Sequence, residues 1–370
     1  MKPIHPPSRA TQLLRWFLRD DLVEEVTGDL EEKFHATRKR SLMMARLNYW
    51  FQVINYIRPF AIRRSRSVHS NPTIMLRHNL IIAFRNFMRF KSSFFINLVG
   101  LSTGLACTFL IYMWVSDELS VDKFNKNDDR LFQAMEFRKR ATGIWTAMSS
   151  PGPMADALVA DIPEVEMAAQ VTWPNPYVLS VGDHNFHVTG RYAAKDYFKM
   201  FSYPLLAGDS TTVISDKSSI AISDHLAIAM FNSLDCIGKT IEFNHGEQFR
   251  VNGVFRKMPD NASDQFDFVL PYEKYRDQND WLASWGNTGI LTMVLLKPGV
   301  DVDALNTKLA DFIKMKTNNQ IVYRTLFLKR YSENYLYGNY DDGVLTGGRI
   351  TYVKLFSVVA IFILLIACIN

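Results

Sequence analysis

The feature that most constrains this chain is an uncharged run of 25 residues from Ser92 to Ser116, of which 16 are apolar. A helix needs about 20 apolar residues to cross the roughly 30 Å hydrocarbon core of a bilayer. The run therefore predicts a transmembrane helix. Tyr112 and Trp114 lie near its far end, where aromatic side chains favour the boundary between lipid and water. A buried helix of a soluble core is the alternative, but such helices rarely stay uncharged for so long.

The charges on the two sides of this run differ in sign. Residues 1–116 hold 17 Lys and Arg against 7 Asp and Glu, whereas residues 117–370 hold 25 against 30. No acidic residue occurs between Lys33 and Ser116. Under the positive-inside rule, we expect the N-terminus in the cytoplasm and the residues from about 117 outside. The first 30 residues offer no apolar core of a signal peptide, so the run predicts an internal anchor.

A second apolar run opens at Leu355 and reaches Asn370, and 14 of its 16 residues are apolar. Sixteen helical residues rise only about 24 Å, which is short of the hydrocarbon core. The run predicts the start of a second transmembrane helix, 355–370, returning to the cytoplasm in a longer protein. A complete protein with a short tail anchor is the alternative.

Residues 1–62 are predicted to form a small cytoplasmic helical domain. Apolar residues recur at helical spacing from Leu13 to Leu30, with an acidic cluster on the remaining face. Arg38, Lys39 and Arg40 mark a break before a second helix at about 42–60. A helical hairpin that packs on itself and a docking module for a partner both remain open.

Residues 63–91 are predicted to be a basic linker followed by an amphipathic helix. Residues 63–73 are polar and basic, and from Ile74 to Lys91 the pattern becomes helical. Arg85 and Arg89 fall on a different face from the apolar residues Leu76, Leu80, Phe84, Phe87 and Met88. A basic amphipathic helix next to a transmembrane helix is expected in the inner headgroup layer. A cytosolic extension of the transmembrane helix is the alternative.

Residues 117–350 mix helix and strand patterns without a regular alternation, which predicts an α+β domain. Expected helices cover 149–161, 196–201, 224–231 and 302–315. Expected strands cover 164–173, 177–181, 185–192, 219–222, 239–244, 248–255, 266–270, 290–297 and 322–329. About 230 residues are enough for a substantial core.

The sequence carries no complete motif for catalysis, phosphate binding or metal binding. Gly238-Lys239-Thr240 resembles the end of a phosphate-binding loop, but the Gly required five residues earlier is replaced by Ser233. His184 and His187 flank a turn without a supporting Cys or carboxylate pattern. We therefore expect no catalytic site, metal or cofactor. The basic residues of 1–116 flank the apolar run, so we expect them to lie at the membrane surface and not to bind nucleic acid.

Gly100 and Gly104 form a GxxxG pattern inside the first transmembrane run. Small residues at this spacing let a second helix approach closely. We therefore predict a helix-packing face at Gly100 and Gly104; a chance occurrence is the alternative.

These pieces, in this order, resemble a MacB/FtsX-type ABC transporter permease over roughly residues 75–370. The similarity lies in the entry helix and first span and in four strings of the outer segment: LRHNLIIAFRNFMRFKSSFFINLVGLSTGLAC, then SSPGPMADALVADIPEVEMAAQV, YFKMFSYPLLAGD, SIAISDHLAIAMFNSLDCIGKTIEF and FRVNGVFRKMPDNASDQFDFVL. The N-terminal LLRWFLRDDLVEEVTGDLEEKF and NYWFQVINYIRPF are similar to the permease prefix domain of some members. Cys236 replaces the usual Pro before Ile-Gly-Lys, and no ATPase domain precedes the first span.

The resemblance implies a multi-pass protein of the inner (cytoplasmic) membrane, with a MacB-like periplasmic core domain at 117–350. It implies that the chain is not itself an enzyme, because ATP hydrolysis belongs to a separate cytoplasmic ABC ATPase. It further implies a dimer of permeases, a periplasmic adaptor, and export or mechanotransmission acting on a peptide, drug, lipoprotein or cell-wall regulator. A membrane-anchored sensor that signals inward is the competing hypothesis. An anchored extracytoplasmic enzyme is a third, but no acid, base and nucleophile come together in the sequence.

Overall fold

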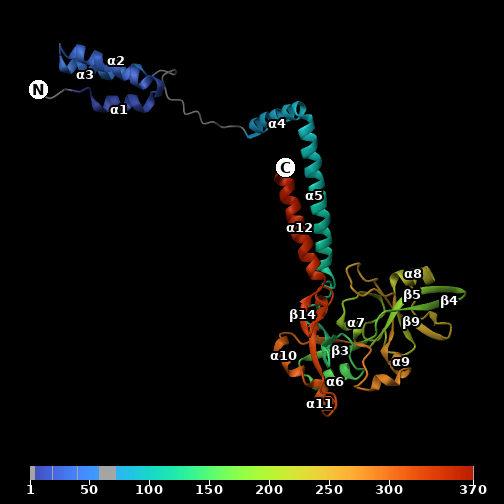
Figure 1. Cartoon of the computed structure of the whole chain (residues 1–370). Coiled ribbons are helices and arrows are strands. Elements are labelled where there is room, and N and C mark those ends of the chain that lie inside the picture. The colour runs from blue at the N-terminus through green and yellow to red at the C-terminus, as the bar shows by residue number, and fades with distance from the viewer. Residues whose placement is uncertain (1–4, 19, 40, 58–71, 370) are drawn as a thin grey trace. The chain divides into compact units, whose positions relative to one another are not determined.

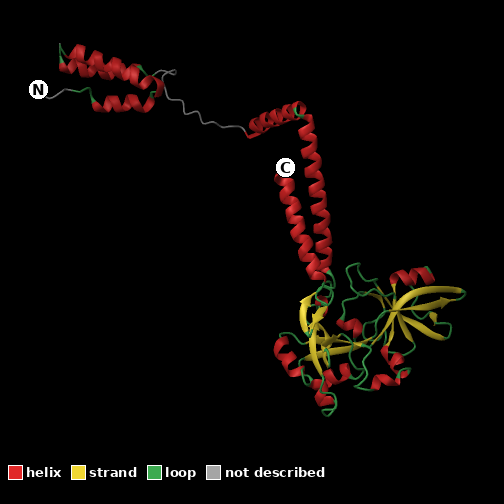
Figure 2. Ribbon diagram, in the orientation of Figure 1, coloured by secondary structure: helices red, strands yellow, loops and turns green. Residues whose placement is uncertain are grey.

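The computed structural model describes residues 5–18, 20–39, 41–57 and 72–369. Its contacts divide the chain into two units, Met1–Phe94 and Phe95–Asn370, which are considered separately. Figure 1 shows the elements in chain order and Figure 2 shows the division into helices and strands.

The first unit contains three packed helices, α1 (Ser8–Phe17), α2 (Asp20–Arg38) and α3 (Leu42–Asn55) (Figure 1). They share a small core made of Ala10, Leu14, Phe17, Leu18, Val26, Leu30, Phe34, Ala45, Tyr49 and Val53. The sequence predicted two helices, and this was wrong, because Leu18 is extended (φ −77°, ψ 144°) and ends α1. Leu18 is itself buried in the core, so the apolar pattern continues through the break and does not reveal it.

Helix α4 (Pro72–Arg89) also belongs to the first unit. It covers most of the predicted amphipathic segment. Its described apolar side chains are exposed, among them Leu76, Leu80, Phe84 and Met88. The predicted linker 63–73 lies outside the described residues except for its last two, which open α4.

Two helices among the described residues are long and apolar enough to cross a membrane: α5 (Lys91–Ser120), which lies in the second unit from Phe95 on, and α12 (Arg349–Ile369). They run side by side in opposite directions, and the rest of the unit follows α5 and precedes α12 (Figure 1). Helix α12 begins six residues before the apolar run that predicted it.

The residues that follow α5 and precede α12 in the sequence form an α+β domain, as the sequence predicted. One lobe contains the antiparallel strands β2 (Gly143–Ala147), β1 (Leu131–Arg140), β12 (Arg324–Arg330), β11 (Leu291–Leu296) and β3 (Val165–Val171). Their inner face packs against α6 (Met154–Asp161), α10 (Val302–Leu309) and α11 (Phe312–Lys316). This lobe joins the next through the pairing of Val171 with Ala193.

The second lobe is a closed ring of six strands. In order around the ring they are β10 (Phe268–Pro271), β7 (Ser219–Ser223), β9 (Glu247–Phe255), β8 (Thr240–Phe243), β4 (Asn175–Val181) and β5 (His184–Ala193). The parallel pairing of β5 with β10 closes it. Short strand β6 (Leu205–Ala207) pairs with β9, while α8 (Asp224–Phe231) and α9 (Tyr272–Asp277) lie against the ring.

An apolar cluster, separate from the packing within each lobe, lies where the two lobes meet. Helix α7 (Tyr197–Met200) contributes to it, and so does the 3-10 turn Tyr331–Glu333. Aromatic side chains dominate this cluster, including Tyr197, Phe198, Phe201, Tyr203, Phe255, Phe266 and Tyr331. Aromatic side chains bury large areas in preferred edge or offset geometries. The cluster therefore ties the two lobes together at the point where a single pair of strands connects them.

Several elements differ from the sequence prediction. The helix expected at 302–315 is two helices, because Asp311 departs from helical geometry (φ −95°, ψ 8°). The apolar residues on both sides of Asp311 are buried in the same core, so the sequence pattern does not reveal the break. The helix expected from residue 149 begins only at Met154, after Pro151 and Pro153. The hairpin β1–β2 and the small hairpin β13 (Asn339–Asp341) with β14 (Val344–Gly347) were not predicted at all.

Strand β1 was missed because it does not alternate. Its first six residues are all buried, and they include Gln133 and Glu136. A central strand covered on both faces loses the period-two pattern that identifies a half-buried strand.

Candidate functional site: the paired helices and their junction with the α+β domain

Gly104 lies at the contact between α5 and α12. A Cβ added at Gly104 would come within 2.6 Å of the Cβ of Ala367 and 3.9 Å of Cγ2 of Ile363. Only a residue without a side chain fits at this separation. The helix-packing prediction named Gly104 together with Gly100, which lies one turn earlier on α5 and is half-buried.

The two predicted interface aromatics have different surroundings. Tyr112 is exposed, whereas Trp114 packs edge-to-face on Phe356 of α12, with ring centroids 5.2 Å apart. Trp114 therefore joins the two helices as well as lying near the end of the apolar run. Its contact with α12 depends on tertiary pairing, and no sequence signal could have indicated it.

Glu118 and Arg349 connect the two helices where they meet the α+β domain. Glu118 lies in the last turn of α5 and is buried, while Arg349 is the first residue of α12. The Nε of Arg349 lies 3.3 Å from Oε2 of Glu118, and its terminal nitrogen donates to Oε1 at 3.3 Å. The guanidinium also lies over the ring of Tyr335, 4.5 Å from its centre. The start of α12 is thus held to the end of α5 by a charge pair and an aromatic contact.

A small apolar cluster surrounds this pair. Leu336, Ile350 and Val353 are its buried members, and Val115 of α5 and Tyr337 pack against it. The backbone N–H of Ile350 donates to the carbonyl of Leu336 at 3.1 Å. Gly348 has φ 148°, and a Cβ there would meet the carbonyl oxygen of Leu336 at 2.5 Å. The segment before α12 is therefore held closely to residues 335–337.

A second attachment holds the end of α5 to the loop 259–267. The Asn261 side chain donates to the carbonyl and hydroxyl of Ser120, at 3.1 and 3.0 Å. In return, the N–H of Asp122 donates to the carbonyl of Asn261, and the N–H of Ser263 donates to Oδ1 of Asp122, both at 2.9 Å. These bonds satisfy backbone groups that the end of a helix leaves free.

Asp122 is a strained and incompletely paired residue in this attachment. It is 1% exposed, its φ is +61°, and its Oδ2 has no hydrogen-bond partner among the described residues. Burial raises the pKa of its carboxyl, and the nearby Asp264 and Asp128 add repulsion, while the bond from Ser263 lowers it. Asp is among the few residues that tolerate this left-handed conformation.

Arg191 of β5 anchors the far end of the same loop. It is fully buried and donates to Oδ2 of Asp264 at 2.7 Å and to the hydroxyl of Tyr197 at 3.1 Å. Its guanidinium lies 5.0 Å from the centre of the Phe266 ring. The loop that holds α5 is therefore itself fixed to the inter-lobe core. Movement at the end of α5 would act directly on that core.

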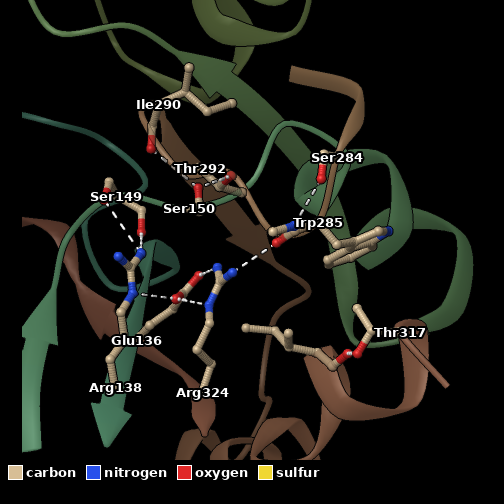
Figure 3. Close-up of polar contacts among 12 residues, drawn as sticks. Glu136, Arg138, Ser149, Ser150, Ser284, Trp285, Ile290, Thr292, Thr317 and Arg324 are labelled. Atoms are coloured by element: carbon tan, nitrogen blue, oxygen red, sulfur yellow. Dashed lines mark hydrogen bonds and ion pairs between the residues drawn. The ribbon is translucent and has the colours of Figure 1, made fainter. Parts of the chain in front are cut away.

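A buried charge network stiffens the first lobe (Figure 3). Glu136 of β1 accepts from Nε of Arg324 on β12 at 2.6 Å and from Nε of Arg138 at 2.8 Å. Arg324 further donates to the carbonyl of Trp285, and Arg138 to that of Ser149, at 2.7 and 2.8 Å. Every member has a partner, so the network fixes two strands and two loops relative to one another.

The remaining predicted residues and motifs are not among the residues that form this junction. Arg85 and Arg89 are exposed on α4 in the first unit, and the guanidinium of Arg89 lies over Phe90. His184 and His187 are exposed on β5. Within the described ranges, no group of three or more His, Cys, Asp and Glu side chains is placed to hold a metal ion.

Sequence reasoning did not identify the junction residues. Glu118 and Asp122 are among the acidic residues that directly follow the apolar run, a pattern that bears on orientation and not on any contact. Asn261 fits only an Asn-Ala-Ser glycosylation sequon, and Arg349 and Arg191 belong to no recognised motif. Their roles depend on contacts between segments more than 70 residues apart in sequence, and a single sequence gives no signal for such contacts.

Comparisons with known proteins point to one family. The family model of the MacB-like periplasmic core domain matches residues 94–312. No curated protein sequence matches the chain. Three solved structures are similar: a domain of a putative permease protein from Porphyromonas gingivalis, the periplasmic region of MacB from Actinobacillus actinomycetemcomitans, and the extracellular domain of the noncanonic ABC-type transporter YknZ from Gram-positive bacteria.

These three structures share little sequence with the chain. In the same order, the identities are 23%, 15% and 11%, and the TM-scores are 0.49, 0.40 and 0.40. The similar regions cover 56%, 55% and 53% of this chain and 92%, 89% and 99% of the other chains. All three TM-scores are below 0.5, so the comparison rests on the family match.

Proposed function

Because the chain belongs to the MacB-like periplasmic core domain family of MacB/FtsX-type ABC transporter permeases, we propose that it couples a cytoplasmic ATPase to its α+β domain. In this proposal α5 and α12 cross the inner membrane, the N-terminus is cytoplasmic, and residues from about 117 are periplasmic. The chain is not itself an enzyme, since ATP hydrolysis takes place on the partner subunit.

The observation that carries the proposal is the double attachment of the domain to its two apolar helices. The pair of Glu118 and Arg349 holds the helices to each other, and the bonds of Asp122 with Asn261 hold α5 to the inter-lobe loop. A small displacement of α5 along or across α12 would therefore move the α+β domain as a rigid body. Sliding of packed helices is a common form of such switching.

The proposed partners are those expected of the family, and the double attachment is consistent with them. A cytoplasmic ABC ATPase supplies the motion, a second permease copy completes the membrane unit, and a periplasmic adaptor or substrate acts on the α+β domain. Export and mechanotransmission both remain within this proposal, because each needs the same link between a membrane helix and an outer domain.

Co-purification is the first test. The full-length protein, extracted in mild detergent, is expected to bring down an ABC ATPase subunit. Arg349→Ala is expected to keep this association, because Arg349 lies at the opposite end of the helices from the cytoplasm. Loss of ATP-dependent transport with retained ATPase binding would support coupling through the junction. Recovery of a signalling partner and no ATPase would support an inward-signalling sensor instead.

Topology is the second test. A reporter that is active only in the periplasm is expected to work when fused near Gly208 and to fail when fused near Ser70. The reverse pattern would contradict the proposed orientation.

A further inference from the structure

Helix α3 of the first unit has two apolar faces, and only one of them is used by the core. Ala45, Tyr49 and Val53 point inward at intervals of four residues and are buried. A surface helix of a small domain normally carries one apolar face, and the opposite face is polar. The second apolar face therefore needs a separate explanation.

The second face is a continuous exposed stripe. At 100° per residue it falls within one sector of about 100°, on the side of α3 away from the core. Exposure of its members ranges from 56% to 75%. We call this set the α3 stripe: Met43, Met44, Leu47, Phe51 and Ile54. Isolated exposed apolar residues are normal, but a contiguous patch of large ones marks an interaction surface.

The charged residues of α3 and of the turn that precedes it are basic. The acidic residues of the first unit end at Glu32, and none occurs from Lys33 to Ser116. The exposed Arg46 lies on α3 beside the stripe, and Lys39 precedes the helix. The acidic residues Glu24, Glu25, Glu31 and Glu32 are carried by α2. An apolar stripe with basic neighbours is complementary to an anionic lipid surface.

The chain itself keeps this surface near lipid. Fourteen residues, 58–71, separate Ile57 from Pro72 at the start of α4. A chain of this length spans at most about 50 Å in any conformation. Helix α4 repeats the chemistry of the stripe, with exposed Leu76, Leu80, Phe84 and Met88 and the basic Arg85 and Arg89. Two basic apolar helices thus precede the first apolar span.

We propose that the α3 stripe is a membrane-binding surface that lays the N-terminal helical domain on the anionic inner leaflet. The acidic α2 would then remain on the side facing the cytosol. Anionic phospholipid is the occupant to which the proposal commits. A cytoplasmic protein and a second copy of this chain are the alternatives that the test separates. The proposal rests on the membrane topology given under the proposed function.

The experiment uses the full chain reconstituted into vesicles. All three natural cysteines, Cys107, Cys236 and Cys368, are replaced by alanine, and a single environment-sensitive fluorophore is attached at Leu47→Cys. The matched control carries the fluorophore at Glu24→Cys on α2. Vesicles of phosphatidylcholine alone are compared with vesicles that contain one quarter phosphatidylglycerol.

In anionic vesicles the label at residue 47 is expected to shift to the blue and to be quenched by spin-labelled lipid. The label at residue 24 is expected to show neither change. High salt is expected to weaken the effect, because the basic neighbours contribute through screened charge. A label at residue 47 that stays as water-exposed as the label at residue 24 would overturn the proposal.

A second pair of variants tests the stripe itself, with the fluorophore moved to Met43→Cys. Phe51→Glu is expected to abolish the blue shift. Asn55→Glu, which adds the same charge to the same helix off the stripe, is expected to leave it. Both positions are exposed, so the fold should tolerate both changes.

Three other outcomes would also decide the question. A shift that appears only after addition of the ATPase subunit would overturn the proposal in favour of a protein partner. A shift that depends on the protein-to-lipid ratio would overturn it in favour of a second copy. Failure of the whole chain to float with vesicles would count against the proposed transmembrane topology itself, which flotation measures independently of the stripe.

Discussion

Arg349, the first residue of α12, lies against Glu118 in the last turn of α5, with its Nε 3.3 Å from Oε2. The two partners differ in exposure, because the Glu118 side chain is 8% exposed and that of Arg349 is 56% exposed. Removing one partner therefore has a different consequence from removing the other. This asymmetry gives the first prediction.

Arg349→Ala is expected to destabilise the protein by about 1–2 kcal/mol, because it leaves a buried carboxylate without its cation. Glu118→Ala leaves an arginine that solvent can still reach, so a smaller loss is expected. Chemical unfolding of the two variants and of the double variant, in the same detergent, measures both effects and their coupling. Equal losses for the two single variants would contradict the role assigned to burial.

Gly104→Val is expected to weaken the pairing of α5 and α12 by about 1–3 kcal/mol through overpacking against Ala367. Thermal unfolding in detergent measures the change. Ala106→Val is the matched control, because Ala106 lies on the same helix and is exposed. A Gly104 variant as stable as the Ala106 variant would show that the helices do not need this close approach.

Glu136→Ala is expected to be among the most damaging changes in the α+β domain, at about 3–5 kcal/mol, since it leaves Arg324 buried without a counter-charge. Arg138→Ala should cost less, because Arg138 is partly exposed and Arg324 still pairs with Glu136. Unfolding monitored by circular dichroism ranks the two variants. The opposite order would mean that Arg138 is the main partner of Glu136.

Asp122→Asn is expected to stabilise the protein at neutral pH. Asn keeps an acceptor for Ser263, tolerates the positive φ, and removes a buried charge whose pKa burial raises. Because the folded state holds this proton more tightly than the unfolded state, stability should fall as pH rises through the raised pKa of Asp122. The Asn variant should lack that component, and Asp122→Ala should be less stable than both.

Lys329 gives a prediction with the opposite sign. Burial lowers its pKa to about 8, and its ammonium donates to the carbonyl of Tyr337 and lies 5.0 Å from the centre of the Tyr340 ring. The unfolded state therefore binds this proton more tightly, and stability should rise between pH 8 and 10, by at most about 1.4 kcal/mol per pH unit. Lys329→Met should flatten this rise in pH-dependent melting curves.

The sequence by itself determined those features that depend on local pattern and on solvent. The 25-residue uncharged run predicted α5, because its length and apolar composition are those of a helix that can cross a bilayer. Alternation and turn residues predicted strands such as β4 and β9 to within two residues of their observed bounds, and α8 is observed with the predicted bounds Asp224–Phe231. The resemblance to a permease family was also readable, because order and spacing survive where identity is low.

Only the tertiary structure decided which residues connect the two long apolar helices, α5 and α12, to the α+β domain. Glu136 in β1 looks unlike a strand residue until Arg324, 188 positions later, pairs with it. Asp122 and Asn261, like Glu118 and Arg349, meet although many strands and helices of the α+β domain separate them in the sequence. Such partners are selected by geometry rather than by local propensity. A buried charge is stable only when folding brings its counter-charge next to it. The periodicity of apolar and polar residues in the sequence does not identify such a distant partner.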